Sequence, residues 1–592
     1  MTSFSAEVQG EPDTALSDAA GESRPQLVAD SSGSAGPDSA HVGDIIGAFG
    51  RIARDATGPG RSRWQRLRTL MVITGPGLIV MIGDNDAGGV ATYSQVGQNY
   101  GMSLLWTLVL MIPVLYVNQE MVLRLGAVTG VGHARLIFER FGKFWGAFSL
   151  GDLLILNALT IVTEFIGVSL ALGFLGCPKT IAIPTAAVLL FGVVAGGSFR
   201  RWERLMFVLI ATNVALIPVV LLVHPALGES ARGLIPSLPG EPDSIVLMVI
   251  ISIVGTTVAP WQLFFQQSNV VDKRITPRWI PYGRADLVIG IVGVIGGGVA
   301  LMAATAFGLG GTSDAGNFID AGAVASQLSH HVGHTVGVLF AIVLLDCSLI
   351  GANVIGLSTT YALGDAVGKP HSLHWKVTEA PLFYSTYAAL LALSAAVAFS
   401  PDHVLGLITQ GVQVLAGILL PSATVFLVLL CNDRPVLGPW ANTFRQNALA
   451  WIIVWSLVVL SLMLTVVTLF PNLSTATLEG GLVVGAVIGL LGAAIVFAIG
   501  WYADRRGAED TVPFGALDPD QIEELDNLPK LTRADRKAFR DKVRATWRMP
   551  AFPTLERPLM SPVRRAGLLT LRVYLVLAGV VVVVKVVQAG VG

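Results

Sequence analysis

Long apolar segments follow one another along most of this chain, and short polar segments separate them. A helix needs about 20 predominantly apolar residues to cross the hydrocarbon core of a bilayer, and about thirteen segments are long enough. They are roughly 70–95, 102–124, 144–174, 179–198, 203–224, 244–268, 285–309, 335–363, 381–399, 403–431, 448–470, 481–502 and 567–589. The pattern therefore predicts an all-α protein that passes through a membrane many times.

The polar segments divide the chain further. Residues 1–65 are rich in Ser, Gly, Ala, Asp and Pro, a composition that predicts a disordered tail. Within the polar segment at 504–565, residues 518–547 have helical patterning, which predicts a helix on the membrane surface or packed under the core. The remaining expected divisions are a core of about ten helices at 66–431, helices 11 and 12 at 432–503, the polar segment at 504–565, and an extra transmembrane helix at 566–592.

Composition and charge agree with a membrane protein and predict its orientation. Hydrophobic residues make up 53% of the chain and charged residues 13%, whereas soluble domains average about 25% charged. Cytoplasmic loops carry the excess of Lys and Arg. The basic clusters here precede the first span and follow spans four, six and twelve: 61–68, 199–204, 272–284 and 501–506. We therefore expect a multi-pass protein of the cell membrane with a cytoplasmic N-terminus, a monomer in the lipid bilayer with no nucleic-acid partner.

The first predicted span contains acids where a membrane helix should be apolar, in MIGDNDAGGVATYSQ (81–95). Asp84 and Asp86 would point about 200° apart on a regular helix, so they could not face one cavity. Each carboxylate at membrane depth costs about 2.5–3.5 kcal/mol. Gly88 and Gly89 permit the helix to unwind, and unwound backbone at that depth is tolerated where it lines a cavity. A kinked helix with its acids near one membrane interface is the alternative.

A second interruption lies five spans later, in IVGTTVAPWQLFFQQS (253–268). Pro260 removes a backbone donor and disfavours helix at Ala259. The carbonyl groups that are freed near Thr256 and Thr257 are suitable ligands for a cation. Two interrupted segments in corresponding positions predict an inverted-repeat transporter whose substrate binds at the breaks.

Several segments are similar to one family. GPGLIVMIGDNDAGGVATYSQVGQNYGMSLLW (75–106) resembles the first transmembrane segment of the natural-resistance-associated macrophage protein (NRAMP) family of divalent metal transporters, and the resemblance covers roughly 66–503. It places Asp86 on the family's metal-binding aspartate, Glu164 on the glutamate of span three and Gln413 on the coordinating glutamine of span ten. The resemblance implies a LeuT-type 5+5 inverted-repeat core with discontinuous helices 1 and 6, additional C-terminal transmembrane helices, and transport by alternating access.

The departures from the family pattern bear on the transported ion. Gly89 replaces an asparagine ligand, Ala259 replaces the binding methionine, Trp261 replaces a histidine and Ile161 replaces an aspartate. A thioether favours soft metals, whereas Mg²⁺ is a hard ion that takes oxygen ligands and keeps several waters. These changes resemble the NRAMP-related magnesium transporters. The resemblance then implies transport of Mg²⁺, with Mn²⁺ as a second substrate, and without proton coupling because the histidine and aspartate positions of the coupling route are changed.

The expected site and its alternatives can now be stated. Metal contacts are expected at Asp86, Asp84, Gly89, Ala259 and Gln413, and path or supporting roles at Asn85, Glu164, Trp261, Gln262, Thr256 and Asn157. Glu164 and Asn157 could line the path or satisfy each other, and His133 is expected to be solvated. The alternatives are a proton-coupled Mn²⁺/Fe²⁺ transporter and a sodium-coupled amino-acid transporter on the same fold. No nucleophile–base pair or phosphate loop supports an enzyme, so we expect no cofactor besides the transported ion.

Overall fold

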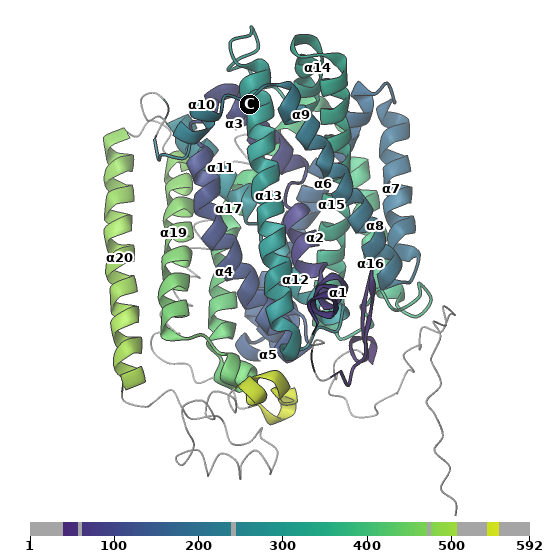
Figure 1. Cartoon of the computed structure of the whole chain (residues 1–592), viewed down its shortest axis with the longest axis vertical. Coiled ribbons are helices and arrows are strands. Elements are labelled where there is room, and N and C mark those ends of the chain that lie inside the picture. The colour runs from purple at the N-terminus through teal and green to yellow at the C-terminus, as the bar shows by residue number, and fades with distance from the viewer. Residues whose placement is uncertain are drawn as a thin grey trace, which may run out of the picture.

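The computed structural model describes residues 39–56, 58, 62–237, 239, 244–469, 475–505 and 541–555, and it is almost entirely helical there (Figure 1). One antiparallel hairpin, β1 (Ile45–Gly47) and β2 (Gly50–Ile52), precedes the helices. The first half contains η1 (Ser39–His41), α1 (Arg63–Ile73), α2 (Pro76–Ile82), α3 (Ala87–Tyr100), α4 (Leu105–Thr129), α5 (His133–Phe141), α6 (Lys143–Phe174), α7 (Lys179–Ala195), α8 (Phe199–Thr212), η2 (Asn213–Ala215), α9 (Leu216–Leu222) and α10 (Leu227–Arg232). The second contains α11 (Ser244–Thr257), α12 (Pro260–Asp272), η3 (Pro277–Trp279), α13 (Ile280–Leu309), α14 (Ala321–His331), α15 (His334–Val367), α16 (Pro381–Val397), α17 (Asp402–Cys431), α18 (Arg434–Leu437), η4 (Gly438–Trp440), α19 (Phe444–Leu469), α20 (Thr475–Arg505) and η7 (Phe552–Thr554).

The helix order is that of the expected inverted repeat. The first repeat runs from the broken pair α2/α3 through α4, α6 and α7 to α8/α9, and the second from the broken pair α11/α12 through α13, α15 and α16 to α17. The two broken pairs occupy corresponding positions, and α12 packs against α2 in the middle of the bundle (Figure 1). The fold is therefore the LeuT-type core, and α19 and α20 stand beside it as additional helices, with α19 between α17 and α20.

Length and apolarity support the membrane assignment. Eight helices of the described ranges are long and apolar enough to cross a membrane, or nine if a bent pair formed by α17 and the α18–η4 segment is counted. The first predicted span is not among them because its break divides it into two short helices. The α7 and α16 helices are apolar but shorter than the eight that are counted. Large apolar side chains are exposed on outer helices, for example Val188 on α7, Val292 on α13 and Leu490 on α20, where they match a lipid environment.

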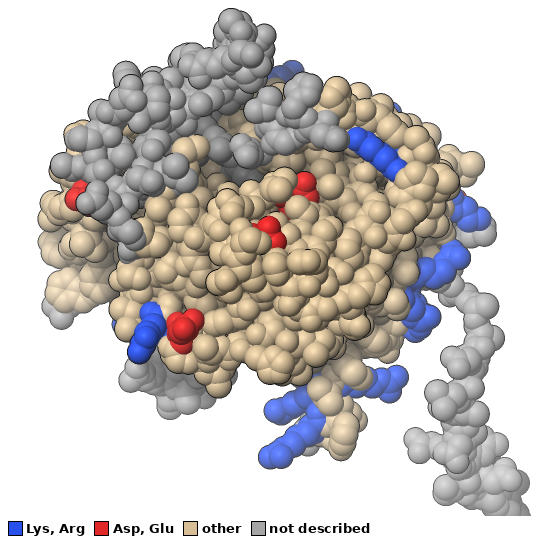
Figure 2. All heavy atoms as spheres, turned by 90° about the horizontal axis from the view of Figure 1, so that it is seen from above, with Lys and Arg blue, Asp and Glu red and all other residues tan. Residues whose placement is uncertain are grey.

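The polar connections distinguish the two ends of the bundle. The basic segments at 62–68, 199–204, 272–284 and 501–505 share one end, which we call the basic end. The opposite end carries α10 and α14, and Figure 2 shows that it exposes few charged side chains across its middle. At the basic end Asp286 of α13 accepts the N–H groups of Gly75 (3.1 Å), Gly77 (2.7 Å) and Leu78 (3.2 Å). It thereby satisfies the donors that the start of α2 would otherwise leave unpaired.

A buried ion pair ties three helices together beside this cap. Lys273, just after α12, donates to Glu203 of α8 at 2.5 Å and to the carbonyl of Thr74 at 2.7 Å, and both charged side chains are fully buried. Gly75 has φ of 155°, and a Cβ there would lie 2.1 Å from Glu203 Oε1. Only glycine permits this close approach at that backbone angle. The start of α2 is therefore fixed to α8 and α12 at the basic end.

Part of the segment that the composition predicted to be disordered is ordered. Residues 39–56 pack against the basic end, with Ile45 and Ala48 buried. The Ala48 N–H donates to Glu203, and Arg204 Nε donates to the Ala48 carbonyl at 2.9 Å. The prediction of disorder was wrong here. It rested on the average composition of the segment, which is polar and does not reveal that a few side chains and backbone groups are buried against the core.

The C-terminal polar segment also contacts the basic end where it is described. Residues 541–546 are helical, Trp440 Nε1 donates to the Arg544 carbonyl at 2.8 Å, and the Met549 N–H donates to the Val128 carbonyl at 3.3 Å. Most of the helix predicted at 518–547 and the whole of the last predicted span lie outside the described residues. The division of the chain into segments stays a prediction.

Candidate metal site between two helix breaks

The first break lies at residues 83–86, between α2 and α3. Asp86 is extended, with φ of −67° and ψ of −175°, and its Oδ1 accepts the Gly89 N–H at 2.8 Å. This is the N-cap arrangement, in which a side-chain oxygen satisfies a donor of the first turn. Gly88 and Gly89 are therefore helical, and the expectation that the chain unwinds at the glycines was wrong. The cap requires their N–H groups in helical geometry, so the unwound residues precede Asp86.

The second break is where the proline predicts it. The α11 helix ends at Thr257, Ala259 is extended with φ of −104° and ψ of 147°, and Pro260 is the first residue of α12. Proline suits this position because the first helical residue has no intrahelical use for an N–H. The Ala259 carbonyl accepts the Gln262 N–H at 3.2 Å, and its side chain adds no ligand atom.

Side chains connect the two breaks. Gln262 Nε2 donates to Asp84 Oδ1 and also reaches the Thr257 carbonyl at 3.3 Å. Gln119 of α4 orients this amide by donating to Gln262 Oε1 at 3.0 Å. A second link joins the Tyr93 hydroxyl to Thr257 Oγ1 at 2.8 Å. Asp84 thus contacts Gln262 of α12, whereas Asp86 caps α3.

Asp86 and Glu164 approach each other around a glycine. Glu164 of α6 is fully buried, and its Oε2 accepts the Ala87 N–H at 3.0 Å. A Cβ on Gly351 of α15 would lie 2.7 Å from that Glu164 oxygen and 2.9 Å from Asp86 Cβ. Two carboxylates that share one buried space repel each other unless a cation or proton compensates them. The sequence analysis did not identify Gly351, because a glycine in a long apolar helix gives no chemical signal.

At the breaks and on helices α4, α6 and α12, several buried oxygen atoms have no hydrogen-bond partner among the described residues. They are Asp84 Oδ2, Asn85 Oδ1, Glu164 Oε1, Thr256 Oγ1, Gln119 Oε1 and Gln266 Oε1. Such atoms are rare in folded proteins, and carboxylate and amide oxygens are the ligands of hard cations. The described residues hold no group of three or more His, Cys, Asp or Glu placed as a metal-ligand set. An ion here would therefore rest on few carboxylates and on neutral oxygens.

Other predicted residues have structural partners. Asn85 donates to the Val294 carbonyl of α13 at 3.2 Å. Asn157 donates to Thr359 Oγ1 at 2.9 Å, while Glu164 holds the Ala87 N–H, so these two side chains do not satisfy each other. Trp261 is buried, and its ring centre lies 6.4 Å from that of Phe265. Gln413 belongs to α17, but its side chain lies outside the described residues.

His133, expected to be solvated, is buried in the structure. Its Nδ1 lies 2.8 Å from Gln267 Oε1, and its ring packs edge-on against Phe264. Burial lowers the pKa of His133 to about 4, although the hydrogen bond to Gln267 opposes the shift. The imidazole is therefore neutral near pH 7 and does not act as a charged proton carrier there. The loop position suggested exposure, but Gln267 of α12 reaches the ring.

Comparison with known proteins identifies relatives over most of the chain. The family model for natural resistance-associated macrophage protein-like proteins matches residues 77–467. The divalent metal cation transporter MntH of Ralstonia nicotianae is 30% identical over 406 residues, which cover 65% of this chain and 88% of that protein. MntH of Levilactobacillus brevis is 28% identical over 432 residues, which cover 68% and 90%.

A solved structure shares the fold. The manganese transporter of Eremococcus coleocola, crystallised with an aromatic bis-isothiourea substituted compound, aligns with a TM-score of 0.58 at 20% identity. The alignment covers 76% of this chain and 98% of that one. At this identity the likeness establishes the fold alone.

The close approach at Gly351 gives a direct test of the site. We expect Gly351→Ala to weaken binding of Mn²⁺ or Mg²⁺ about tenfold, because overpacking costs about 1–3 kcal/mol and the new methyl group displaces Glu164. Isothermal titration of the purified protein measures the affinity. Gly296→Ala on α13 is the matched control, since an added Cβ there meets nothing within 4 Å. Equal affinities in the two variants would show that Gly351 does not border the ion.

Proposed function

We propose that this chain, which belongs to the natural resistance-associated macrophage protein-like family, carries Mg²⁺ across the membrane, with Mn²⁺ as a second substrate. It is a divalent metal cation transporter, and homologous proteins are named as transporters rather than enzymes. The observation that carries the choice of ion is the donor set at the two breaks. Asp84, Asn85 and Thr256 each leave a buried oxygen without a partner at the breaks, and Ala259 provides no sulfur at the start of α12.

Helix ends add to this preference for a cation. The C-terminal ends of α2 and α11 both lie at the breaks, and carbonyl groups at such ends carry partial negative charge. Discontinuous helices of transporters use these ends to coordinate cations. We place the ion on Asp86, with Asp84 and the carbonyl groups near Thr256 and Ala259 around it, and Gln413 completing the site from α17. Mg²⁺ keeps several of its waters and needs only one or two carboxylates.

Manganese is the second candidate, and the comparisons favour it. The relatives carry the name divalent metal cation transporter MntH, and the structural neighbour is a manganese transporter. Mn²⁺ also accepts carboxylate, carbonyl and water ligands, so an oxygen site does not reject it. In our proposal the residue at position 259 decides between the two ions. A thioether there would add affinity for Mn²⁺, the softer metal, and Ala259 has none.

We further propose that transport is not coupled to protons. Trp261 packs in the core, Ile161 is fully buried, and His133 stays neutral near pH 7. A divalent ion gains about twice 2.3 kcal/mol per 100 mV of membrane potential, which drives accumulation without protons. The Lys and Arg of the basic end support a cytoplasmic location for that end and for the N-terminus. We propose a monomer in the cell membrane.

The role of Asp86 is tested by two substitutions. Asp86→Asn retains a side-chain oxygen that can cap α3, so we expect a folded protein whose metal uptake into proteoliposomes falls to background because the ionised ligand is gone. Asp86→Ala loses the cap as well and should be less stable by about 1 kcal/mol. Thermal unfolding of both variants separates the two effects. Normal uptake by Asp86→Asn would remove Asp86 from the site.

Ion choice is tested at the second break. Ala259→Met adds a thioether at the start of α12, so we expect competition by Cd²⁺ and Mn²⁺ against Mg²⁺ uptake to become stronger by about tenfold or more. Ala259→Leu adds similar bulk without sulfur and serves as control. If both variants change the competition equally, the added side-chain volume at position 259 is the cause of the change. If neither shifts it, ligand softness at position 259 does not set the preference.

Coupling is tested in liposomes that contain a pH-sensitive dye, with the voltage clamped by valinomycin and potassium. We expect Mg²⁺ entry without internal acidification, since Trp261 and Ile161 offer no titratable group. Acidification that follows metal entry at clamped voltage would establish the proton-coupled alternative. An ionophore that carries the divalent ion alone provides the control for leak.

A further inference from the structure

Residues 39–56 cross the basic end of the bundle before the first half-helix begins, and we call them the N-terminal strap (Figure 1). They contain η1, β1 and β2 and precede residues 77–467, which match the family model. In the strap, η1 contacts α12, β1 contacts α8, and both strands contact α1. The strap therefore joins helices that belong to different parts of the transporter core.

The turn of the hairpin completes the buried ion pair at this end. Glu203 Oε1 of α8 accepts Lys273 Nζ at 2.5 Å, and the other carboxylate oxygen accepts the Ala48 N–H of the turn. Arg204 Nε of α8 donates to the Ala48 carbonyl at 2.9 Å. A buried carboxylate needs partners for both of its oxygens. The link between α8 and the end of α12 therefore depends in part on the strap.

The hairpin also lies directly against α1. A Cβ on Gly47 would lie 2.1 Å from the Val72 carbonyl oxygen, and a Cβ on Gly50 would lie 2.8 Å from Val72 Cγ2. Such distances leave no room for a side chain between the hairpin and the last turn of α1. Because α1 leads through Thr74 into α2, the hairpin connects the start of the first broken pair to α8.

The residue after the buried Lys273 holds the first part of the strap. Arg274 Nε donates to the Ala40 carbonyl at 2.7 Å, and its Nη1 donates to the Asp44 carbonyl at 3.3 Å. Arg274 has φ of 64°, a backbone angle that is uncommon for residues other than glycine. The strap is thus bonded to the chain immediately beyond α12.

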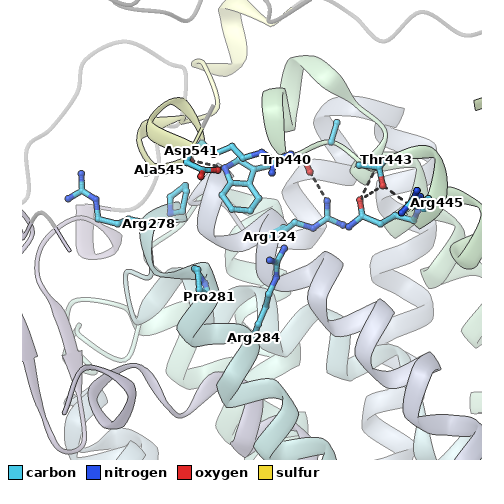
Figure 3. Close-up of a pocket in the computed structure, with 13 residues that line it drawn as sticks. Arg124, Arg278, Pro281, Arg284, Trp440, Thr443, Arg445, Asp541 and Ala545 are labelled. Atoms are coloured by element: carbon cyan, nitrogen blue, oxygen red, sulfur yellow. Dashed lines mark hydrogen bonds between the residues drawn. The ribbon is translucent and has the colours of Figure 1, made fainter. Parts of the chain in front are cut away.

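The last part of the strap is held by η3. Arg278 of η3 donates to the Ala56 carbonyl. Figure 3 shows Arg278 at the edge of a separate cavity of about 620 Å³, which Asp541 and Ala545 of the C-terminal segment also line. Both terminal segments of the chain are therefore attached around η3, in the connection from α12 to α13.

These contacts join elements that must separate if the basic end opens. The start of α2 lies against Glu203 of α8 at Gly75, and Lys273 donates to the Thr74 carbonyl at 2.7 Å. Parting α2 from α8 would break this arrangement and would also pull the hairpin away from α1 or from α8. The docked strap therefore favours the closed state of the basic end.

We propose that the N-terminal strap is a latch that holds the basic end closed and limits how often α2 parts from α8. The proposal rests on the transport function proposed above, because alternating access requires each end to open in turn. The opening itself, however, is measurable without metal and without transport.

Two substitutions in the full-length protein loosen the strap in different ways. Gly47→Ala places a Cβ against the backbone of α1, so the hairpin cannot dock without moving. Arg204→Gln removes the donor to the Ala48 carbonyl and leaves both groups of the ion pair in place. Arg201→Gln is the matched control, an exposed arginine of the same helix that donates to the Gly196 carbonyl at 2.6 Å.

Hydrogen–deuterium exchange of the metal-free protein, followed by mass spectrometry, measures the opening of each segment. We expect amides at 45–52 and at 75–82 to exchange about tenfold faster in Gly47→Ala and Arg204→Gln, because losing one charge-assisted hydrogen bond shifts an equilibrium by about that factor. We expect no change in Arg201→Gln or in Gly228→Ala on α10, whose added Cβ meets nothing within 4 Å. Mn²⁺ uptake into proteoliposomes should rise in both strap variants, and thermal unfolding confirms that they are folded.

Faster exchange at 45–52 with unchanged exchange at 75–82 would overturn the proposal, since the strap would then move without releasing α2. Uptake by the strap variants that does not exceed that of Arg201→Gln would overturn it as well, because opening of the basic end would not limit transport. Absence of uptake by the unaltered protein would contradict the proposed function instead, and the exchange rates would still decide whether the strap is a latch.

Discussion

A polar group buried among apolar helices needs a partner, and each helix break creates several such groups at once. The donors at the starts of the half-helices are satisfied: Asp286 accepts those of α2, Asp86 caps α3 and Pro260 has no N–H to satisfy. The acceptors are not satisfied to the same degree, since Glu164 Oε1 and Asp84 Oδ2 have no partner in the described parts of the chain. The breaks therefore present an excess of oxygen acceptors, which a cation can balance.

The same constraint explains how the site is held in place. Gln262 spans from α12 to Asp84 across the gap between the breaks, and Gln119 fixes the amide that does so. Lys273 and Glu203 tie the outer end of this arrangement to α8. Removing the partner from a buried charge costs far more than an exposed pair contributes, so these groups oppose independent movement of α2 and α12. The alternating access that the proposed function implies would exchange these bonds between α2, α8 and α12.

The sequence predicts those features that depend on residue types close together along the chain. An acid cluster in an apolar span and a proline in another indicated both breaks, and the opposed directions that Asp84 and Asp86 would have on a regular helix indicated that this segment is not one. The features that were missed depend on tertiary contacts. Gly351 is recognisable only once α15 lies against Asp86 and Glu164, and His133 is buried only because Gln267 of a distant helix reaches it. The ordered hairpin at 39–56 is likewise stabilised by α8, more than a hundred residues away.

The location of the ion is the central claim, and anomalous scattering from crystals grown with Mn²⁺ tests it most directly. Manganese serves as the probe because it scatters anomalously and Mg²⁺ does not. The account predicts one peak between the breaks, in direct contact with the Asp86 carboxylate, surrounded by oxygen ligands and absent from crystals of Asp86→Asn. A peak elsewhere in the transporter core, or an unchanged peak in that variant, would contradict the account.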